Sequence, residues 1–182
     1  MKKILLGLLL LAGFQVFAQS DYEVITEKKT KTVIYKGECN FGDLLKEPSF
    51  AWLKSGAEAY SVDSATRVYL ASNLKNYKLV VFMGTWCDDT YNILPKLYKT
   101  LQVTNFPMSQ YTMYAVDRNK ATKNIEHKLY RVQNVPTIIV FKGSIEIGRI
   151  TEAIKKSVEK DIATIIRDNL NKDEMMKEMK GN

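Results

Sequence analysis

Blocks of apolar residues in the second half of the chain predict strands of a buried sheet. Residues 79–83 (Leu-Val-Val-Phe-Met) form a continuous apolar run, which is typical of a strand covered on both faces. A second hydrophobic run, 137–141, is followed by a Lys-Gly-Ser turn and another strand-like segment, which predicts a hairpin. The strands predicted after residues 79–83 are therefore 111–116, 137–141 and 145–150.

Helical patterns alternate with these strands. Apolar residues recur at spacings of three and four after residue 88, and the same pattern returns close to the end of the chain. The predicted helices lie around 93–101, 122–131 and 155–170. The order β-α-β-α-β-β-α predicts an α/β fold in which helices cover a central mixed sheet, over a domain of residues 78–170.

The preceding residues, 19–77, predict an N-terminal extension that packs on this domain. Two short β-rich runs, 22–26 and 32–35, are separated by a charged turn. Apolar residues in 44–53 suggest helical structure, and Asp63 or Ser64 is a suitable N-cap for a helix that runs to about residue 76. The aromatic residues of this part are most simply contacts between the extension and the core.

Residues 1–18 have the pattern of a secretory signal peptide. Lys2 and Lys3 precede an almost entirely apolar stretch, and Ala18 with Val16 fits a signal-peptidase cleavage site. The stretch is short of the ~20 residues that a transmembrane helix needs. We therefore expect an exported protein, periplasmic or secreted, with no membrane span after cleavage.

Composition and charge exclude several classes of protein. Of 182 residues, 46% are hydrophobic and 26% are charged, which is ordinary for a globular domain. The net charge of +7 would fall to +5 without the two leader lysines, and its even spread does not suggest nucleic-acid binding. Residues 171–182 form a charged C-terminal tail. One histidine, His127, and two cysteines are too few for the usual zinc motifs, so no metal site and no cofactor are expected.

Cys87 is the strongest candidate for chemistry. It lies where the buried strand turns into a helix, and free N–H groups and the helix dipole stabilise a thiolate there. Thr90, one helical turn further on, is placed to donate a hydrogen bond to the sulfur. Asp88 and Asp89 act in the opposite direction, because neighbouring negative charges disfavour a second anion.

This part of the sequence resembles the thioredoxin superfamily, over about residues 78–170. Within that superfamily it is similar to exported bacterial thioredoxin-like proteins with a Trp-Cys-x-Asp-Ser/Thr motif. The motifs that carry the resemblance, in chain order, are Gly84-Thr85-Trp86-Cys87-x-Asp89-Thr90, Pro95, Ala115-Val116-Asp117-Arg118, Val135-Pro136-Thr137, and Phe141-Lys142-Gly143-Ser144 followed by Glu146-Ile147-Gly148-Arg149.

The resemblance implies a role for each matched residue. Cys87 would be the nucleophile that forms a mixed disulfide. Trp86 would be a flat apolar platform beside it, and the backbone of Val135 would pair with an extended substrate. Pro136 would be the cis-proline that faces the sulfur.

Two departures from the thioredoxin pattern limit the predicted activity. Thr90 stands where a dithiol enzyme has its resolving cysteine, and Val81 stands where thioredoxin has a buried acid. Cys39, 48 residues before Cys87, is a candidate for a resolving cysteine that is distant in the sequence, for a structural disulfide partner of Cys87, or for an inert thiol. A bond between them requires Cα atoms within about 7 Å.

We therefore expect a thiol-disulfide exchange protein that acts through one cysteine on client proteins, as an isomerase, a reductase or a chaperone-like holder. The alternative is a redox-inert binding module that uses the same groove. A single-cysteine iron–sulfur site is a third and weaker hypothesis. Asp117 and Arg118 either approach Cys87 or form a plain turn.

Overall fold

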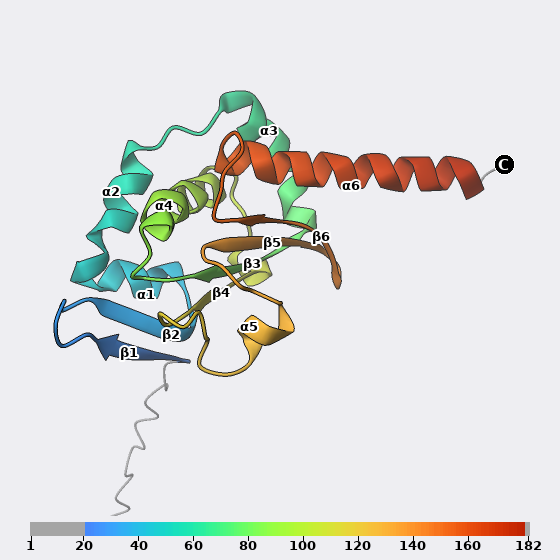
Figure 1. The fold of residues 1–182 in the computed structure, drawn as a ribbon. Coiled ribbons are helices and arrows are strands. Elements are labelled where there is room, and N and C mark those ends of the chain that lie inside the picture. Colours follow the sequence, from blue (N-terminus) through green and yellow to red (C-terminus); the bar gives the residue numbers. More distant parts are fainter. Residues whose placement is uncertain (1–20, 181–182) are drawn as a thin grey trace, which may run out of the picture.

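A computed structural model describes residues 21–180, so the predicted signal peptide lies outside the described residues. One mixed sheet runs through the molecule, with most of its helices on one face (Figure 1). The strands are β1 (Tyr22–Thr26), β2 (Val33–Cys39), β3 (Lys78–Met83), β4 (Tyr111–Ala115), β5 (Thr137–Lys142) and β6 (Ile145–Thr151). The α-helices are α1 (Phe41–Lys46), α2 (Ala51–Ala59), α3 (Ser64–Asn73), α4 (Asp88–Val103), α5 (Glu126–Leu129) and α6 (Val158–Lys180). Short 3₁₀ turns cover Pro48–Phe50, Leu74–Asn76 and Met108–Gln110.

The six strands have the order β1-β2-β4-β3-β5-β6. Among the strands that the structure describes, only β3 and β4 pair in parallel, and α4 forms the crossover between them. The other neighbours pair antiparallel. Strands β1 and β2 therefore belong to the same sheet as the predicted domain, joined to it through three residue pairs between β2 and β4.

Strand β3 separates two apolar clusters. Alternate side chains point to opposite faces of a strand, and here Val81 and Met83 join the main cluster while Val80 and Phe82 join a smaller one. The main cluster lies under helices α1 to α4 and α6. The smaller cluster lies on the face that carries α5, and it consists of Val80, Phe82, Val116, Val132, Val135 and Ile139. This double burial explains the uninterrupted apolar run in the sequence.

Local sequence explains where several helices begin and how closely they pack. Asp63 caps α3 by accepting hydrogen bonds from the backbone N–H and hydroxyl of Thr66, at 2.9 and 2.7 Å. Pro48 separates α1 from α2. Helix α2 crosses α4 closely at Gly56, where a Cβ would lie 2.8 Å from a carbon of Pro95.

Two helices differ from their predicted lengths. The helix expected at 122–131 is reduced to one turn, α5, because the Thr122 backbone and hydroxyl bond the ring of His127 and hold the preceding residues in a loop. The last helix, α6, continues to Lys180 and projects from the body of the molecule (Figure 1).

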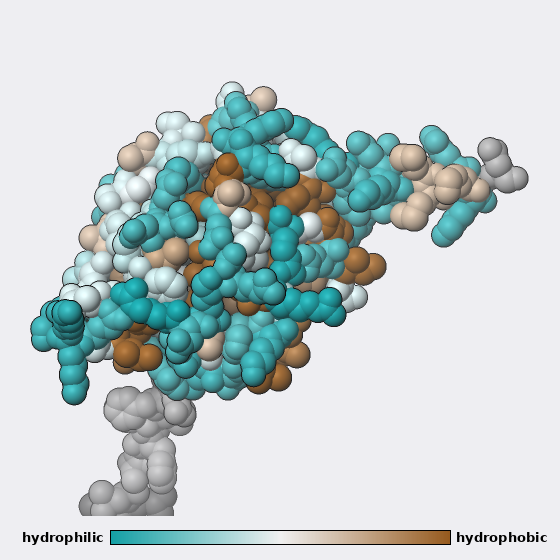
Figure 2. Space-filling model, in the orientation of Figure 1, coloured by the Kyte–Doolittle hydropathy of each residue, from teal (hydrophilic) through white to brown (hydrophobic). Residues whose placement is uncertain are grey.

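The projecting end of α6 has a mixed surface of charged and apolar residues (Figure 2). Met175, Met176 and Met179 are exposed there among lysine and glutamate side chains. Helix α6 therefore extends beyond the residues that pack on the core.

Among residues 21–180, no helix is both long and apolar enough to cross a membrane.

Candidate active site at Cys87

The sheet topology brings three segments to one edge. Parallel strands β3 and β4 end at this edge, and they lead into the loops that contain Cys87 and Val116. Strand β5 runs antiparallel to β3, so its beginning lies at the same edge and brings Val135 and Pro136 there. Carboxyl ends of strands in α/β sheets are common places for functional sites.

The loop before Cys87 requires a glycine. A Cβ on Gly84 would lie 2.8 Å from the Trp86 indole, closer than two carbons approach. With glycine there, the Cys87 N–H reaches the Gly84 carbonyl at 3.0 Å and closes a turn. Cys87 then becomes the N-cap residue of α4.

Cys87 is partly exposed, and its thiol faces the loop before β5. The Sγ atom donates to the Val135 carbonyl at 3.3 Å. Its side chain makes no capping bond to the helix, so the sulfur is directed toward Val135. The Val135–Pro136 peptide bond is cis. Cys87, Val135 and Pro136 are thus brought together, as the resemblance implied.

Thr90 lies on the first turn of α4, and its observed hydrogen bond is to the loop before Cys87. It is fully buried, and its hydroxyl accepts a hydrogen bond from the Gly84 N–H at 3.3 Å. The oxygen of this hydroxyl therefore serves the loop backbone as an acceptor, and the donor bond to Cys87 that the sequence suggested is not among the hydrogen bonds of residues 21–180. The physical reason is that Thr90 turns inward on the first turn of α4, under the loop that carries Trp86.

Trp86 precedes Cys87 in the chain, and a hydrogen bond at the edge of its indole ring fixes its position. Its indole N–H donates to the Val116 carbonyl at 2.9 Å, just after the end of β4. The Arg118 guanidinium lies over the ring, 5.3 Å from the centroid. One face of the Trp86 ring is thus covered by Arg118. Of the two alternatives that the sequence left open for Arg118, this contact favours the one that brings it toward Cys87.

The N-terminal hairpin is fastened to the site, a relation that the sequence did not reveal. The buried Thr85 hydroxyl accepts from the Tyr35 N–H at 3.1 Å and donates to the Val33 carbonyl at 3.0 Å. Glu27 pairs with Arg118, and its Oε2 accepts from Nη2 at 2.9 Å. No local pattern signals these contacts, because they join residues that are 50 or more positions apart in the sequence.

Ion pairing sets the charge state of the carboxylates in this region. The hydrogen bond from Arg118 and that from the Thr30 hydroxyl lower the pKa of Glu27 to about 2. Burial opposes ionisation of Asp117, but the Lys36 ammonium at 2.8 Å and two backbone N–H groups keep its pKa below the usual value. Both carboxylates are therefore charged at neutral pH.

Cys39 lies in another part of the molecule. It ends β2, pairs with Met113 of β4 and belongs to the main apolar cluster, whereas Cys87 packs on the smaller cluster. Both are free cysteines. Burial, with a smaller effect of Asp43, raises the pKa of the Cys39 thiol well above its ordinary value. The structure does not bring the two sulfurs together.

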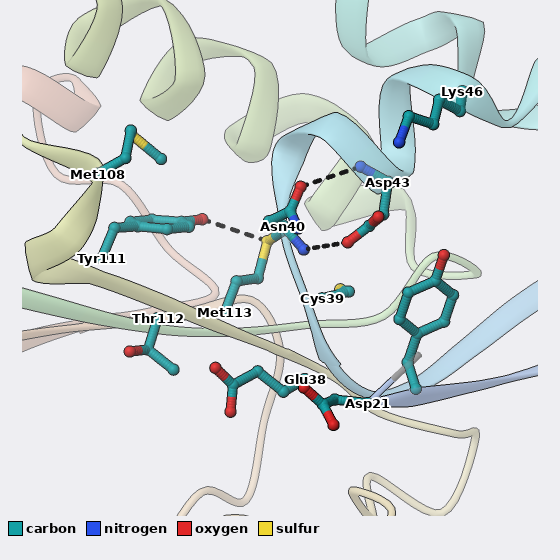
Figure 3. Close-up of a pocket in the computed structure, with 11 residues that line it drawn as sticks. Asp21, Glu38, Cys39, Asn40, Asp43, Lys46, Met108, Tyr111, Thr112 and Met113 are labelled. Atoms are coloured by element: carbon teal, nitrogen blue, oxygen red, sulfur yellow. Dashed lines mark hydrogen bonds between the residues drawn. The ribbon is translucent and has the colours of Figure 1, made fainter. Parts of the chain in front are cut away.

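A pocket of ≈ 510 Å³ lies beside Cys39 rather than beside Cys87 (Figure 3). Asn40 and Asp43 form a reciprocal capping pair at its wall, with bonds of 3.0 and 3.1 Å. The Tyr111 hydroxyl donates to the Met113 sulfur at 3.2 Å.

Within residues 21–180, no group of three or more His, Cys, Asp or Glu side chains could hold a metal ion.

The fold and the site define a thioredoxin-like protein: a mixed sheet, a cysteine at the start of the helix after β3, and a cis-proline opposite it. The thioredoxin family model matches residues 57–167, more than half of the chain. The protein therefore belongs to the thioredoxin family. The match begins before the predicted domain boundary at residue 78 and includes the end of α2 and all of α3.

Solved structures resemble the fold at low sequence identity. A protein of unknown function from Pseudomonas aeruginosa is 14% identical, with a TM-score of 0.56 over 72% of this chain and 93% of its own. An HIV epitope scaffold is 15% identical, with a TM-score of 0.54 and the same coverage of both chains. No curated protein matches the chain.

Proposed function

We propose that this protein is an exported thiol-disulfide exchange protein that acts on client proteins through Cys87 alone. The observation that carries the proposal is the position of Cys87. It is the N-cap residue of α4, is partly exposed and faces Val135, while the residue one turn later is a buried threonine with no thiol.

The exchange begins when the Cys87 thiol loses its proton to solvent. The thiolate attacks one sulfur of a client disulfide, so that a Cys87–client S–S bond forms and the client S–S bond breaks. The second client sulfur leaves as a thiolate and takes up a proton. Two electrons move between sulfurs, and no external oxidant or reductant is consumed in this step.

Resolution of the mixed disulfide requires a thiol from outside this site. Thr90 has a hydroxyl in place of a thiol, so it cannot form the new disulfide bond to Cys87 that would expel the client. A second client thiol releases Cys87 with the client disulfide rearranged, which is isomerisation. An external low-molecular-weight thiol or a partner protein would instead release the client reduced. The proposal favours isomerisation or holding over general reduction.

An extended client segment has a place beside the sulfur. The Val135 N–H makes no hydrogen bond within residues 21–180, so it is available to pair with a client backbone. The Pro136 carbonyl already accepts from the Glu152 N–H at 2.9 Å. The client would therefore add at Val135, with Trp86 as an apolar contact on the other side.

Export is proposed from the sequence of residues 1–18. An oxidising compartment outside the cytoplasm supplies clients with disulfides, which are rare in the cytosol. The leader and a disulfide-directed activity thus support each other. A redox-inert module that binds clients in the same groove is the competing hypothesis, and Cys87 distinguishes the two.

The test is formation of a mixed disulfide with a peptide disulfide of neutral sequence. We expect one peptide per chain by intact mass, mapped to Cys87, released by dithiothreitol, and absent in Cys87→Ala. Cys39→Ala is the matched control, because it removes the other thiol and should leave the adduct intact. Lack of an adduct, combined with peptide binding that is equal in Cys87→Ala, would establish the redox-inert alternative.

A further inference from the structure

Arg118 occupies the face of Trp86 beside the proposed nucleophile. Its guanidinium carbon lies 5.3 Å from the ring centroid, and its side chain is 48% exposed. Trp86 is itself held by Val116 and precedes Cys87 directly. A client sulfur that reaches Cys87 must therefore bring its neighbouring residues close to a cation.

Glu27 positions this guanidinium without using all of its donors. The carboxylate bonds Nε and Nη2, and Glu27 is fixed in turn by the Thr30 hydroxyl at 2.6 Å. An arginine has five N–H donors, and Nη1 makes no hydrogen bond within residues 21–180. Arg118 is thus held on Trp86 with donors left for a second carboxylate.

The loop that carries Arg118 is held together by hydrogen bonds to Asp117, and it also carries Lys120. Asp117 accepts from the N–H groups of Asn119 and Ala121 at 2.9 and 3.1 Å. Lys120 from the same loop donates to the side chain of Asn134, the residue before Val135. Cations therefore flank the site at Trp86 and at the cis-proline loop.

The whole segment that borders this side of the site is basic. Residues 117–134 contain five lysines and arginines and two acids. The acidic residues nearest in sequence to the nucleophile, Asp88 and Asp89, are exposed on the first turn of α4. These two carboxylates weaken the attraction of negatively charged clients in general. Selection among clients therefore depends on whether a client carboxylate lies near Arg118.

We propose that Arg118 is a specificity-determining residue that favours clients with a carboxylate next to the reacting cysteine. The substrate class is an acidic cysteine-containing segment, with its carboxylate on Arg118 and its sulfur at Cys87. This inference rests on the proposed function, and it adds to it the charge of the preferred client.

The experiment uses three peptides that differ only at the residue before cysteine: Glu, Gln or Lys. The cysteine of each is activated as a mixed disulfide with 2-thiopyridine. Cys87 attacks the peptide sulfur, the Cys87–peptide bond forms, and the pyridyl sulfur leaves as pyridine-2-thione, whose absorbance gives the rate. Chain variants carry Arg118→Gln, Arg118→Lys, Glu27→Gln or Lys128→Gln.

The wild type should react faster with the Glu peptide than with the Gln peptide, by roughly two- to five-fold, the range of an exposed ion pair. Arg118→Gln should bring this ratio to one, and Arg118→Lys should keep part of it. Glu27→Gln should raise the ratio, because the amide oxygen still accepts a hydrogen bond that positions Arg118 while the competing negative charge is removed. Lys128→Gln, which removes a charge from the same segment in α5, should leave the ratio unchanged, and added salt should reduce it.

Alkylation by uncharged iodoacetamide, measured on each variant, separates selectivity from general reactivity of Cys87. A Glu-to-Gln ratio of one in the wild type, or one unchanged in Arg118→Gln, would overturn the inference while leaving the proposed function intact. An equal loss in Lys128→Gln would overturn it in favour of overall charge. Failure of all three peptides to react would overturn the proposed function and this inference together.

Discussion

Thr85 offers a quantitative test of how the N-terminal hairpin is tied to the site. Its hydroxyl completes two hydrogen bonds to β2, at residues where β2 has no pairing with β4. Thr85→Val preserves the shape of the side chain but leaves the Tyr35 N–H and the Val33 carbonyl without that partner. The loss costs about 1–3 kcal/mol at the buried Tyr35 N–H and about 1 kcal/mol at the half-buried Val33 carbonyl, so we expect a decrease of about 2–4 kcal/mol in the free energy of unfolding.

Urea unfolding followed by circular dichroism measures this decrease, and the melting temperature should fall by roughly 5–15 °C for a chain of this size. Thr100→Val is the matched control. Thr100 is also fully buried, but its hydroxyl only adds a bond to the Lys96 carbonyl one helical turn earlier, so its loss should cost less than about 1 kcal/mol. Equal stability of the two variants would refute the assigned role of Thr85.

Two further substitutions test other parts of the site. Thr90→Val should reduce the free energy of unfolding by about 1–2 kcal/mol, because it leaves the Gly84 N–H unpaired. The alkylation rate of Cys87 should not change. A large fall in that rate would instead show that Thr90 donates a hydrogen bond to the sulfur, as the sequence suggested. Glu27 has a folded pKa of about 2 against 4.5 for the free group, so its contribution is complete above pH 4.5 and is lost as the pH falls toward 2. The stability difference between wild type and Glu27→Gln should therefore shrink over that interval, and a difference independent of pH would contradict the ion pair with Arg118.

The sequence predicted the central part of the fold because its signals are local. The apolar run of β3, the Asp63 cap and the turn before β6 each depend on neighbouring residues. The short α5 was missed because a side-chain bond from Thr122 to His127 replaces the helical one. The length of α6 was missed because the charged residues past 170 were interpreted as a tail after the helix, whereas the helix continues along them to Lys180.

The site was predicted in part for the same reason. Cys87 and its helix start follow from the strand-turn-helix pattern, and the resemblance supplied the opposing Val135-Pro136 loop. The pairing of Arg118 with Glu27 and the bonds of Thr85 to β2 depend on the register of a distant hairpin. No spacing in the sequence specifies that register.

Selective alkylation tests the central claim, that Cys87 is the accessible thiol that does the chemistry. The native protein is treated with iodoacetamide over a range of pH, and the modified residue is identified by mass spectrometry. We predict that one thiol reacts, Cys87, at the same rate in Cys39→Ala, and that Cys39 reacts only after unfolding because burial raises its pKa. A native protein in which neither thiol reacts until it is reduced, or in which Cys39 reacts first, would contradict the account.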